Sequence, residues 1–172
     1  MANSVVTRGL DQLGVLLSAV TPEDVGRATP CAEWTVADLS DHIVNSVAGM
    51  ATMARGGEPD WATSTHHDDP VSALNREGGV LIEALDAGNG AFPEAMAAAE
   101  LAVHAYDLTV ALGRTTADLD PEVAEAGRAF MTASMTDDVR GEAFGPEQPA
   151  PDDADAYERI AAFAGRRLSL LR

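Results

Sequence analysis

Residues 94–114 read EAMAAAELAVHAYDLTVALGR, and this stretch decides the fold. Its apolar residues recur on nearly every side of a helix, which is typical of a helix buried in the interior of a protein. Three titratable residues interrupt the apolar pattern: Glu100, His104 and Asp107. At about 100° per residue they fall within roughly 60° of one another, so they form one narrow polar strip. Apolar residues flank this strip on both sides, and we therefore expect it to face the interior.

A carboxylate and an imidazole in such a position need partners, because burying either group alone costs several kcal/mol. Glu100 and His104 are one helical turn apart, so both side chains can reach the same point in the interior. A divalent metal ion held between them is the simplest compensation. The strip therefore predicts a metal site.

A third ligand is predicted on another helix, expected over residues 35–53. This helix has one apolar stripe, formed by Val36, Leu39, Ile43, Val47 and Met50. His42 and Ser46 lie at the edge of the stripe, roughly 100° from its centre, where a side chain can reach a neighbouring helix. If the two helices pack side by side, His42, Glu100 and His104 supply two imidazoles and one carboxylate. This donor set suits zinc and also admits nickel, iron or manganese, and three protein ligands leave one position open for water or substrate.

Two further residues near these ligands have alternative interpretations. Asp107 either accepts a hydrogen bond from the second ring nitrogen of a ligating histidine, or is a surface carboxylate that pairs with Arg114. Cys31 is either a small buried residue, or a reactive thiol or additional metal ligand. Arg27 is the one cation that the sequence places near this thiol.

The remaining candidates are expected to be structural. His66 and His67 lie in a polar run beside two aspartates, which indicates a solvated loop. Met131 and Met135 are four residues apart and are expected to belong to the core.

Helical periodicity runs through the whole chain, and no sustained alternation indicates strands. We expect helices at residues 5–20, 35–53, 70–86, 93–112, 121–135 and 154–163. Thr35 and Asp38 have the spacing of a capping box at the start of the second helix. Four longer helices with shorter ones at the carboxyl end indicate an all-α helical bundle, and the 172 residues are predicted to form a single domain over residues 1–172.

The charge balance excludes several classes of function. The chain has 28 acidic and 11 basic residues and a formal net charge of -17, so nucleic acid and anionic membranes are poor partners. All the basic residues are arginine, and the absence of lysine excludes a Schiff-base nucleophile and a Walker-type phosphate loop.

The expected compartment is the cytoplasm. The single cysteine cannot form an internal disulfide, which fits a reducing environment. Arg8 and Asp11 interrupt the apolar positions of the amino-terminal segment, which therefore resembles neither a signal peptide nor a membrane span.

Three segments carry a specific resemblance that covers most of the chain. They are TPCAEWTVADLSDH at residues 29–42, ELAVHAYDL at residues 100–108, and the tail FGPE…PDDA…RIAAFAGR within residues 144–166. Together they resemble the mycothiol-dependent maleylpyruvate isomerase family of the DinB-like superfamily, whose members are metal-binding four-helix bundles common in actinobacteria. The resemblance implies a DinB-like four-helix bundle with short additional carboxy-terminal helices, and it places the family's His, Glu and His metal ligands on His42, Glu100 and His104.

The resemblance also implies a function. The isomerase that names the family has a second, carboxy-terminal domain that contributes to its active site, and this chain has no room for one, so the isomerase reaction is not expected to carry over unchanged. The leading hypothesis is an enzyme that binds a divalent metal ion and uses mycothiol, a low-molecular-weight thiol. The enzyme would either isomerise a small-molecule substrate or transfer the thiol sulfur to it. One alternative is a non-catalytic metal-binding protein that assists stress response or detoxification. Another is a homodimeric interaction module with a vestigial site.

Overall fold

The helix predicted to be buried lies at the centre of the molecule. In the computed structural model, residues 4–31, 34–88, 92–136, 140 and 144–168 are described, and these ranges contain six α-helices and no strand. The helices are α1 (Val5–Ser18), α2 (Val36–Ala54), α3 (Pro70–Ala87), α4 (Glu94–Ala111), α5 (Pro121–Ser134) and α6 (Ala156–Phe163), with a short 3-10 helix, η1 (Thr116–Asp118), before α5. The all-α helical bundle is therefore confirmed.

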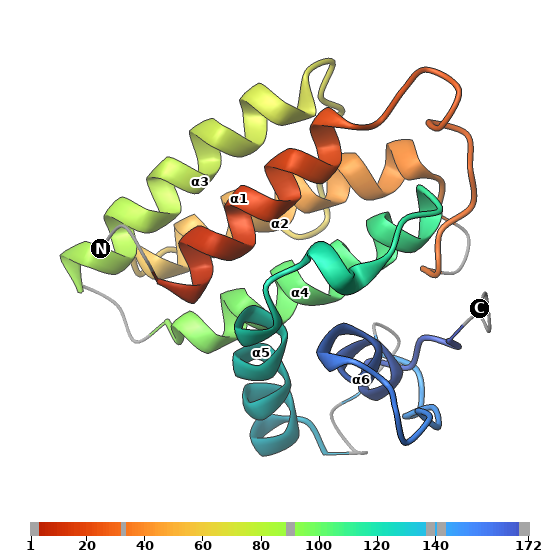
Figure 1. Ribbon diagram of the computed structural model, residues 1–172. Coiled ribbons are helices and arrows are strands. Elements are labelled where there is room, and N and C mark those ends of the chain that lie inside the picture. The colour runs from red at the N-terminus through yellow and green to blue at the C-terminus, as the bar shows by residue number, and fades with distance from the viewer. Residues whose placement is uncertain (1–3, 32–33, 89–91, 137–139, 141–143, 169–172) are drawn as a thin grey trace.

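Helix α4 contacts more of the other helices than a surface helix would. It packs against α1, α2, α5 and α6, while α3 packs on α1 and α2 (Figure 1). Every residue of α4 from Leu101 to Thr109 is buried as a result, including His104 and Asp107. The polar strip consequently faces the interior, as the periodicity predicted.

Local capping chemistry sets where the helices begin. The Thr35 side chain accepts a hydrogen bond from the backbone of Asp38, and the Asp38 side chain accepts one from the backbone of Thr35, so the predicted capping box is present. Helix α6 starts two residues later than predicted because Asp155 forms its own capping box with Glu158. Helix α1 ends at Ser18, two residues before the predicted end.

A glycine allows α5 to lie directly on α4. A Cβ atom at Gly127 would lie 2.6 Å from the Cα atom of Ala99, a separation that real Cβ contacts do not reach. The two backbones can therefore approach closely only without that side chain. This contact brings the last turns of α5 over the part of α4 that carries Glu100.

Within the described ranges, none of the helices combines the length and the apolar character that a membrane crossing requires.

Candidate metal centre

The three predicted ligands lie together between α2 and α4. The Nε2 atom of His42 is 3.1 Å from Oε1 of Glu100 and 3.1 Å from Nε2 of His104. The Nε2 atom of His104 is 3.2 Å from the same Glu100 oxygen. The sequence therefore predicted correctly that the helix edge at His42 reaches the strip on α4.

The spacing and chemistry of these atoms fit a divalent metal ion. A tetrahedral zinc ion with bonds of about 2.0–2.2 Å holds neighbouring ligand atoms roughly 3.3–3.6 Å apart. The three donor atoms form a triangle only a few tenths of an ångström smaller. Two imidazole nitrogens and one carboxylate oxygen also match a donor set found in catalytic zinc sites.

Asp107 fixes the orientation of His104. The Nδ1 atom of His104 donates a hydrogen bond to Oδ2 of Asp107 over 3.1 Å, and Asp107 is fully buried. A carboxylate can only accept, so one ring proton lies on Nδ1, and Nε2 is directed toward Glu100 and His42, where it holds a second proton or, once deprotonated, can offer its lone pair to a metal ion. Asp107 thus has the contact with His104 that its first interpretation required, and the alternative of a surface carboxylate paired with Arg114 is wrong because Asp107 is fully buried and pairs with Arg166.

Arg166 supplies the positive charge that Asp107 needs. Its Nη2 atom lies 3.0 Å from Oδ2 of Asp107, and its Nε atom lies 3.2 Å from Oδ1. Arg166 comes from the segment after α6, and sequence reasoning missed its role, although the residue ends the tail motif. A buried carboxylate with no cation near it was the signal that could have led to it.

Cys31 joins the same cluster. Its thiol donates to Oδ2 of Asp107 over 3.3 Å, and Nη2 of Arg166 donates to Sγ of Cys31 over 2.9 Å. The cation that contacts this thiol is Arg166 and not Arg27, which the sequence placed nearest and which pairs with Asp24. Cys31 is only partly buried, and its Sγ, an imidazole nitrogen of His104 and a carboxylate oxygen of Asp107 form a second group of donor atoms within 4.8 Å of one another.

Ser46 is a further polar contact of the site. Its hydroxyl donates to Oε1 of Glu100 over 2.8 Å and lies 3.1 Å from Nε2 of His42. The sequence placed Ser46 beside His42 on the helix edge but assigned it no role. Its position one turn after His42 was the available signal.

The electrostatics of the cluster favour a cation between the ligands. Burial opposes ionisation of Glu100, but the charge of His104 and hydrogen bonds from both histidines outweigh it and hold the pKa of Glu100 well below its usual 4.5. Burial likewise opposes protonation of His104, yet Glu100, Asp107 and Cys31 raise its pKa well above 6.5. Without a metal ion, a proton on His104 therefore balances the partly buried Glu100 carboxylate, and a divalent cation can take over that role.

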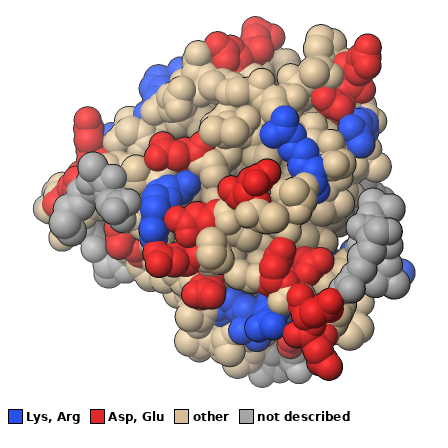
Figure 2. All heavy atoms as spheres, in the orientation of Figure 1, with Lys and Arg blue, Asp and Glu red and all other residues tan. Residues whose placement is uncertain are grey.

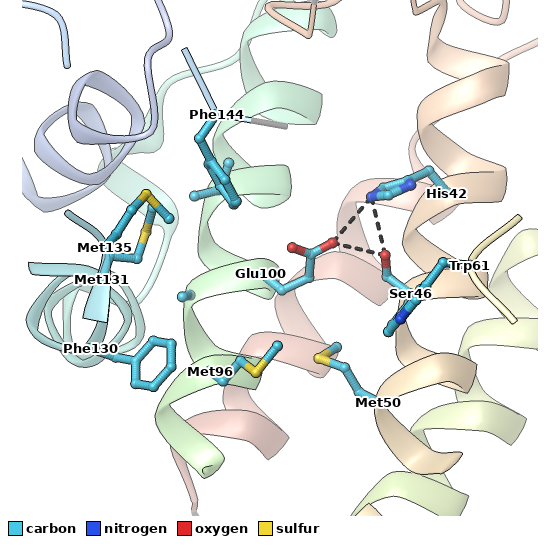
Figure 3. Close-up of a pocket in the computed structure, with 12 residues that line it drawn as sticks. His42, Ser46, Met50, Trp61, Met96, Glu100, Phe130, Met131, Met135 and Phe144 are labelled. Carbon is cyan, nitrogen blue, oxygen red and sulfur yellow. Dashed lines mark hydrogen bonds and ion pairs between the residues drawn. The ribbon is translucent and has the colours of Figure 1, made fainter. Parts of the chain in front are cut away.

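Two of the three candidate ligands, His42 and Glu100, line an apolar cavity of about 300 Å³. Figure 3 shows His42, Ser46 and Glu100 on one side and thioether and aromatic side chains around them. The cavity is lined by His42, Ser46, Met50, Trp61, Met96, Ala99, Glu100, Val103, Phe130, Met131, Met135 and Phe144. Met131 and Met135 pack against the core as predicted, but they also form part of this wall.

Residues 6–152 match the family described as the mycothiol maleylpyruvate isomerase N-terminal domain. The chain belongs to this family. Two uncharacterized proteins of Mycobacterium tuberculosis, from strains CDC 1551 / Oshkosh and ATCC 25618 / H37Rv, are each 29% identical over 172 residues, covering 92% of this chain and 94% of their own. No solved structure matches the chain.

The family match contains all three candidate ligands but not the whole cluster. His42, Glu100 and His104 lie within residues 6–152, whereas Arg166 lies beyond them. Both mycobacterial relatives fit the actinobacterial setting that the resemblance implied.

The two loop histidines lie outside the cluster, as predicted. His66 is 73% exposed and contacts Asp41, while His67 is partly buried and its Nε2 atom lies 3.1 Å from the side-chain oxygen of Asn45.

Proposed function

We propose that this protein binds a divalent metal ion, zinc in the first instance, through His42, Glu100 and His104. The observation that carries the proposal is the meeting of these three donor atoms at one point, beside a cavity that His42 and Glu100 line. Three protein ligands leave a coordination position for an exogenous group. Membership of the mycothiol maleylpyruvate isomerase N-terminal domain family supports mycothiol as that group.

The chain's own residues prepare the site for this role. Asp107 holds the His104 ring with Nε2 toward Glu100 and His42, and Ser46 holds the Glu100 carboxylate by donating to Oε1. The apolar walls offer water few hydrogen-bond partners in the space next to the ligands. When a divalent cation is bound there, its charge favours the thiolate form of a thiol ligand at neutral pH.

The reaction that follows is thiol chemistry on a small electrophile. The thiolate sulfur forms a bond to an electrophilic carbon, and the displaced electron pair leaves with a leaving group or takes up a proton. That outcome is S-transfer. In isomerisation the S–C bond instead breaks again after rotation about the former double bond, and the thiol is regenerated.

Metal analysis tests the first part of the proposal. We expect about one divalent metal ion per chain in the purified protein and a large loss of metal in His42→Ala and His104→Ala. The exposed His66→Ala variant is the matched control and keeps its metal. Equal metal content in the wild type and the two ligand variants would contradict the assignment.

A cobalt-substituted protein tests the thiol. Mycothiol is expected to change the visible absorption bands because a sulfur ligand alters the ligand field of the ion, and an analogue with an alcohol in place of the thiol leaves them unchanged. The response should survive Cys31→Ser, since Cys31 contacts Asp107 and Arg166 and is not among the three ligands. If metal binds but no small thiol changes the bands, a non-catalytic metal-binding protein is the better description.

A further inference from the structure

The walls of the cavity beside the candidate ligands are apolar almost throughout. Four methionines, two phenylalanines and one tryptophan supply most of the surface: Met50, Met96, Met131, Met135, Phe130, Phe144 and Trp61. The polar lining residues are His42, Ser46 and Glu100, and Figure 3 shows their side chains meeting at one side. A molecule in this space therefore meets polar groups only at the end where the donor atoms lie.

The described lining of the cavity offers neither an arginine nor a lysine to an anionic molecule. The chain contains no lysine at all. Arg140, the nearest arginine in sequence to Met135, donates to the backbone carbonyls of Gly145 and Phe163 and lies over the Phe163 ring. Arg166 is held by Asp107 on the other side of His104.

A carboxylate would therefore lose its hydration on entering this space and gain no ion pair from the walls. The formal net charge of -17 adds a repulsive field. Maleylpyruvate, the substrate in the family's name, carries two carboxylates, and a metal ion at the donor atoms could pair with one of them. The second would remain without a partner among methionine and aromatic side chains.

The geometry points to small, uncharged, apolar molecules, rather than dicarboxylates, as the occupants of this cavity. This inference rests on the proposed function in one respect: the occupant is then the electrophile that receives the thiol sulfur. A volume of about 300 Å³ suits up to about three aromatic rings or an alkyl group of similar size. The polar sugar part of mycothiol accordingly lies outside the cavity.

A matched pair of fluorescent dyes tests the preference. N-phenylnaphthylamine is uncharged, and anilinonaphthalene sulfonate has the same rings with one sulfonate added. We expect saturable fluorescence enhancement with the uncharged dye and at least tenfold weaker binding of the sulfonate. Equal or tighter binding of the sulfonate by the wild type, or no binding of the uncharged dye, would overturn the inference.

A variant that adds a cation to the wall should reverse the preference. Met135 is partly buried at the carboxyl end of α5, where an arginine also interacts favourably with the helix dipole. Met135→Arg is expected to bind the sulfonate at least tenfold more tightly than the wild type and the uncharged dye more weakly. Ala133→Arg adds the same charge at an exposed position of the same helix and should bind both dyes as the wild type does. Identical sulfonate affinity in a folded Met135→Arg variant and in Ala133→Arg contradicts the inference.

Competition on the wild-type protein gives a measurement that needs no variant. Diethyl succinate should displace the bound uncharged dye. Succinate should not displace it even at a concentration tenfold higher than that of the ester. Displacement by succinate as readily as by its ester would count against the inference.

The dye should bind with and without a chelator, because the cavity walls hold it. Metal analysis and the cobalt spectrum are separate measurements, so a failure of metal or thiol binding is distinguishable from a failure of the apolar preference.

Discussion

At the scale of single residues, Asp107 connects the candidate ligands to the rest of the protein. It accepts hydrogen bonds from His104, Cys31 and Arg166 while being fully buried. Burial opposes its ionisation, but the hydrogen bond from His104 and the charge of Arg166 outweigh this and lower its pKa. Asp107 is therefore a charged acceptor that holds the ring of a candidate metal ligand, and its contribution to metal affinity is testable.

Asp107→Asn should weaken metal binding by about 10–100-fold, because a neutral amide holds the His104 ring less firmly and makes its Nε2 less basic. Competition with a chelator of known affinity measures the change. Asp11→Asn, which removes a carboxylate from an exposed position of α1, is the control and should leave the affinity unchanged. Equal affinity in the two variants would show that Asp107 has no part in metal binding.

At the scale of helices, the close contact between α4 and α5 shapes the cavity. Met131 and Phe130 on α5 face Glu100 and Met96 on α4 across it. The distance between the two helices is limited by Gly127 against Ala99. Adding even one methyl group there must displace backbone rather than a flexible side chain.

Gly127→Ala is expected to destabilise the protein by about 1–3 kcal/mol through overpacking, despite the better helix propensity of alanine. Gly79→Ala is the matched control, because Gly79 is an exposed position of α3 with nothing within 4 Å of the added Cβ atom. That variant should be more stable by about 0.5–1 kcal/mol. Denaturant unfolding measures the change in the free energy of unfolding for each variant. A stabilising effect of Gly127→Ala would contradict the close contact between Gly127 and Ala99.

At the scale of the whole molecule, metal binding and pH should act on stability together. After chelation, the stabilisation from Glu100 is present above its usual pKa of 4.5 and is lost as pH falls through its lowered folded value. The stabilisation from His104 is present below 6.5 and is lost as pH rises through its raised folded value. Glu100 and His104 therefore stabilise the chelated protein most between the usual pKa values of the two groups, 4.5 and 6.5.

With a metal ion bound, the stability of the protein should no longer fall as the pH rises through the alkaline range. At a free metal concentration of about 100 times Kd the stabilisation is roughly 2.7 kcal/mol, and it decreases on acidification because protons compete for the histidines. Melting curves with and without chelator are thus expected to separate at about pH 7.5 and to converge toward about pH 5. A chelator effect of the same size at both pH values would argue against histidine ligation.

The net charge leads to a second prediction for the whole molecule, which concerns the dependence of its melting temperature on salt. Acidic side chains are spread over the face seen in Figure 2, with arginines between them, and the formal net charge is -17. Sodium chloride screens this repulsion, since the Debye length falls from about 30 Å at 0.01 M to about 3 Å at 1 M. The melting temperature of the chelated protein should therefore rise with salt, and an uncharged osmolyte at equal osmolality should raise it less. A melting temperature that falls with salt would exclude repulsion as a dominant effect.

The sequence by itself determined the helices and the candidate ligands on them. Helical periodicity and capping depend on residues three or four positions apart, so Thr35 with Asp38, and Glu100 with His104, are readable from local spacing. The burial of α4 also follows from its own composition. Only the interpretation of His42 needed an assumption about packing, and its edge position limited the choices.

The tertiary structure alone decided which distant groups complete the site. Arg166 meets Cys31 and Asp107 because α6 packs on α4 and carries the following segment to the strip. The cavity exists because Trp61 before α3 and Met135 at the end of α5 both reach the wall around Glu100. Such contacts depend on how whole helices pack, and their spacing in the chain carries no periodic signal. A local pattern can place a residue on a face, but only the packing of helices against one another determines what that face meets.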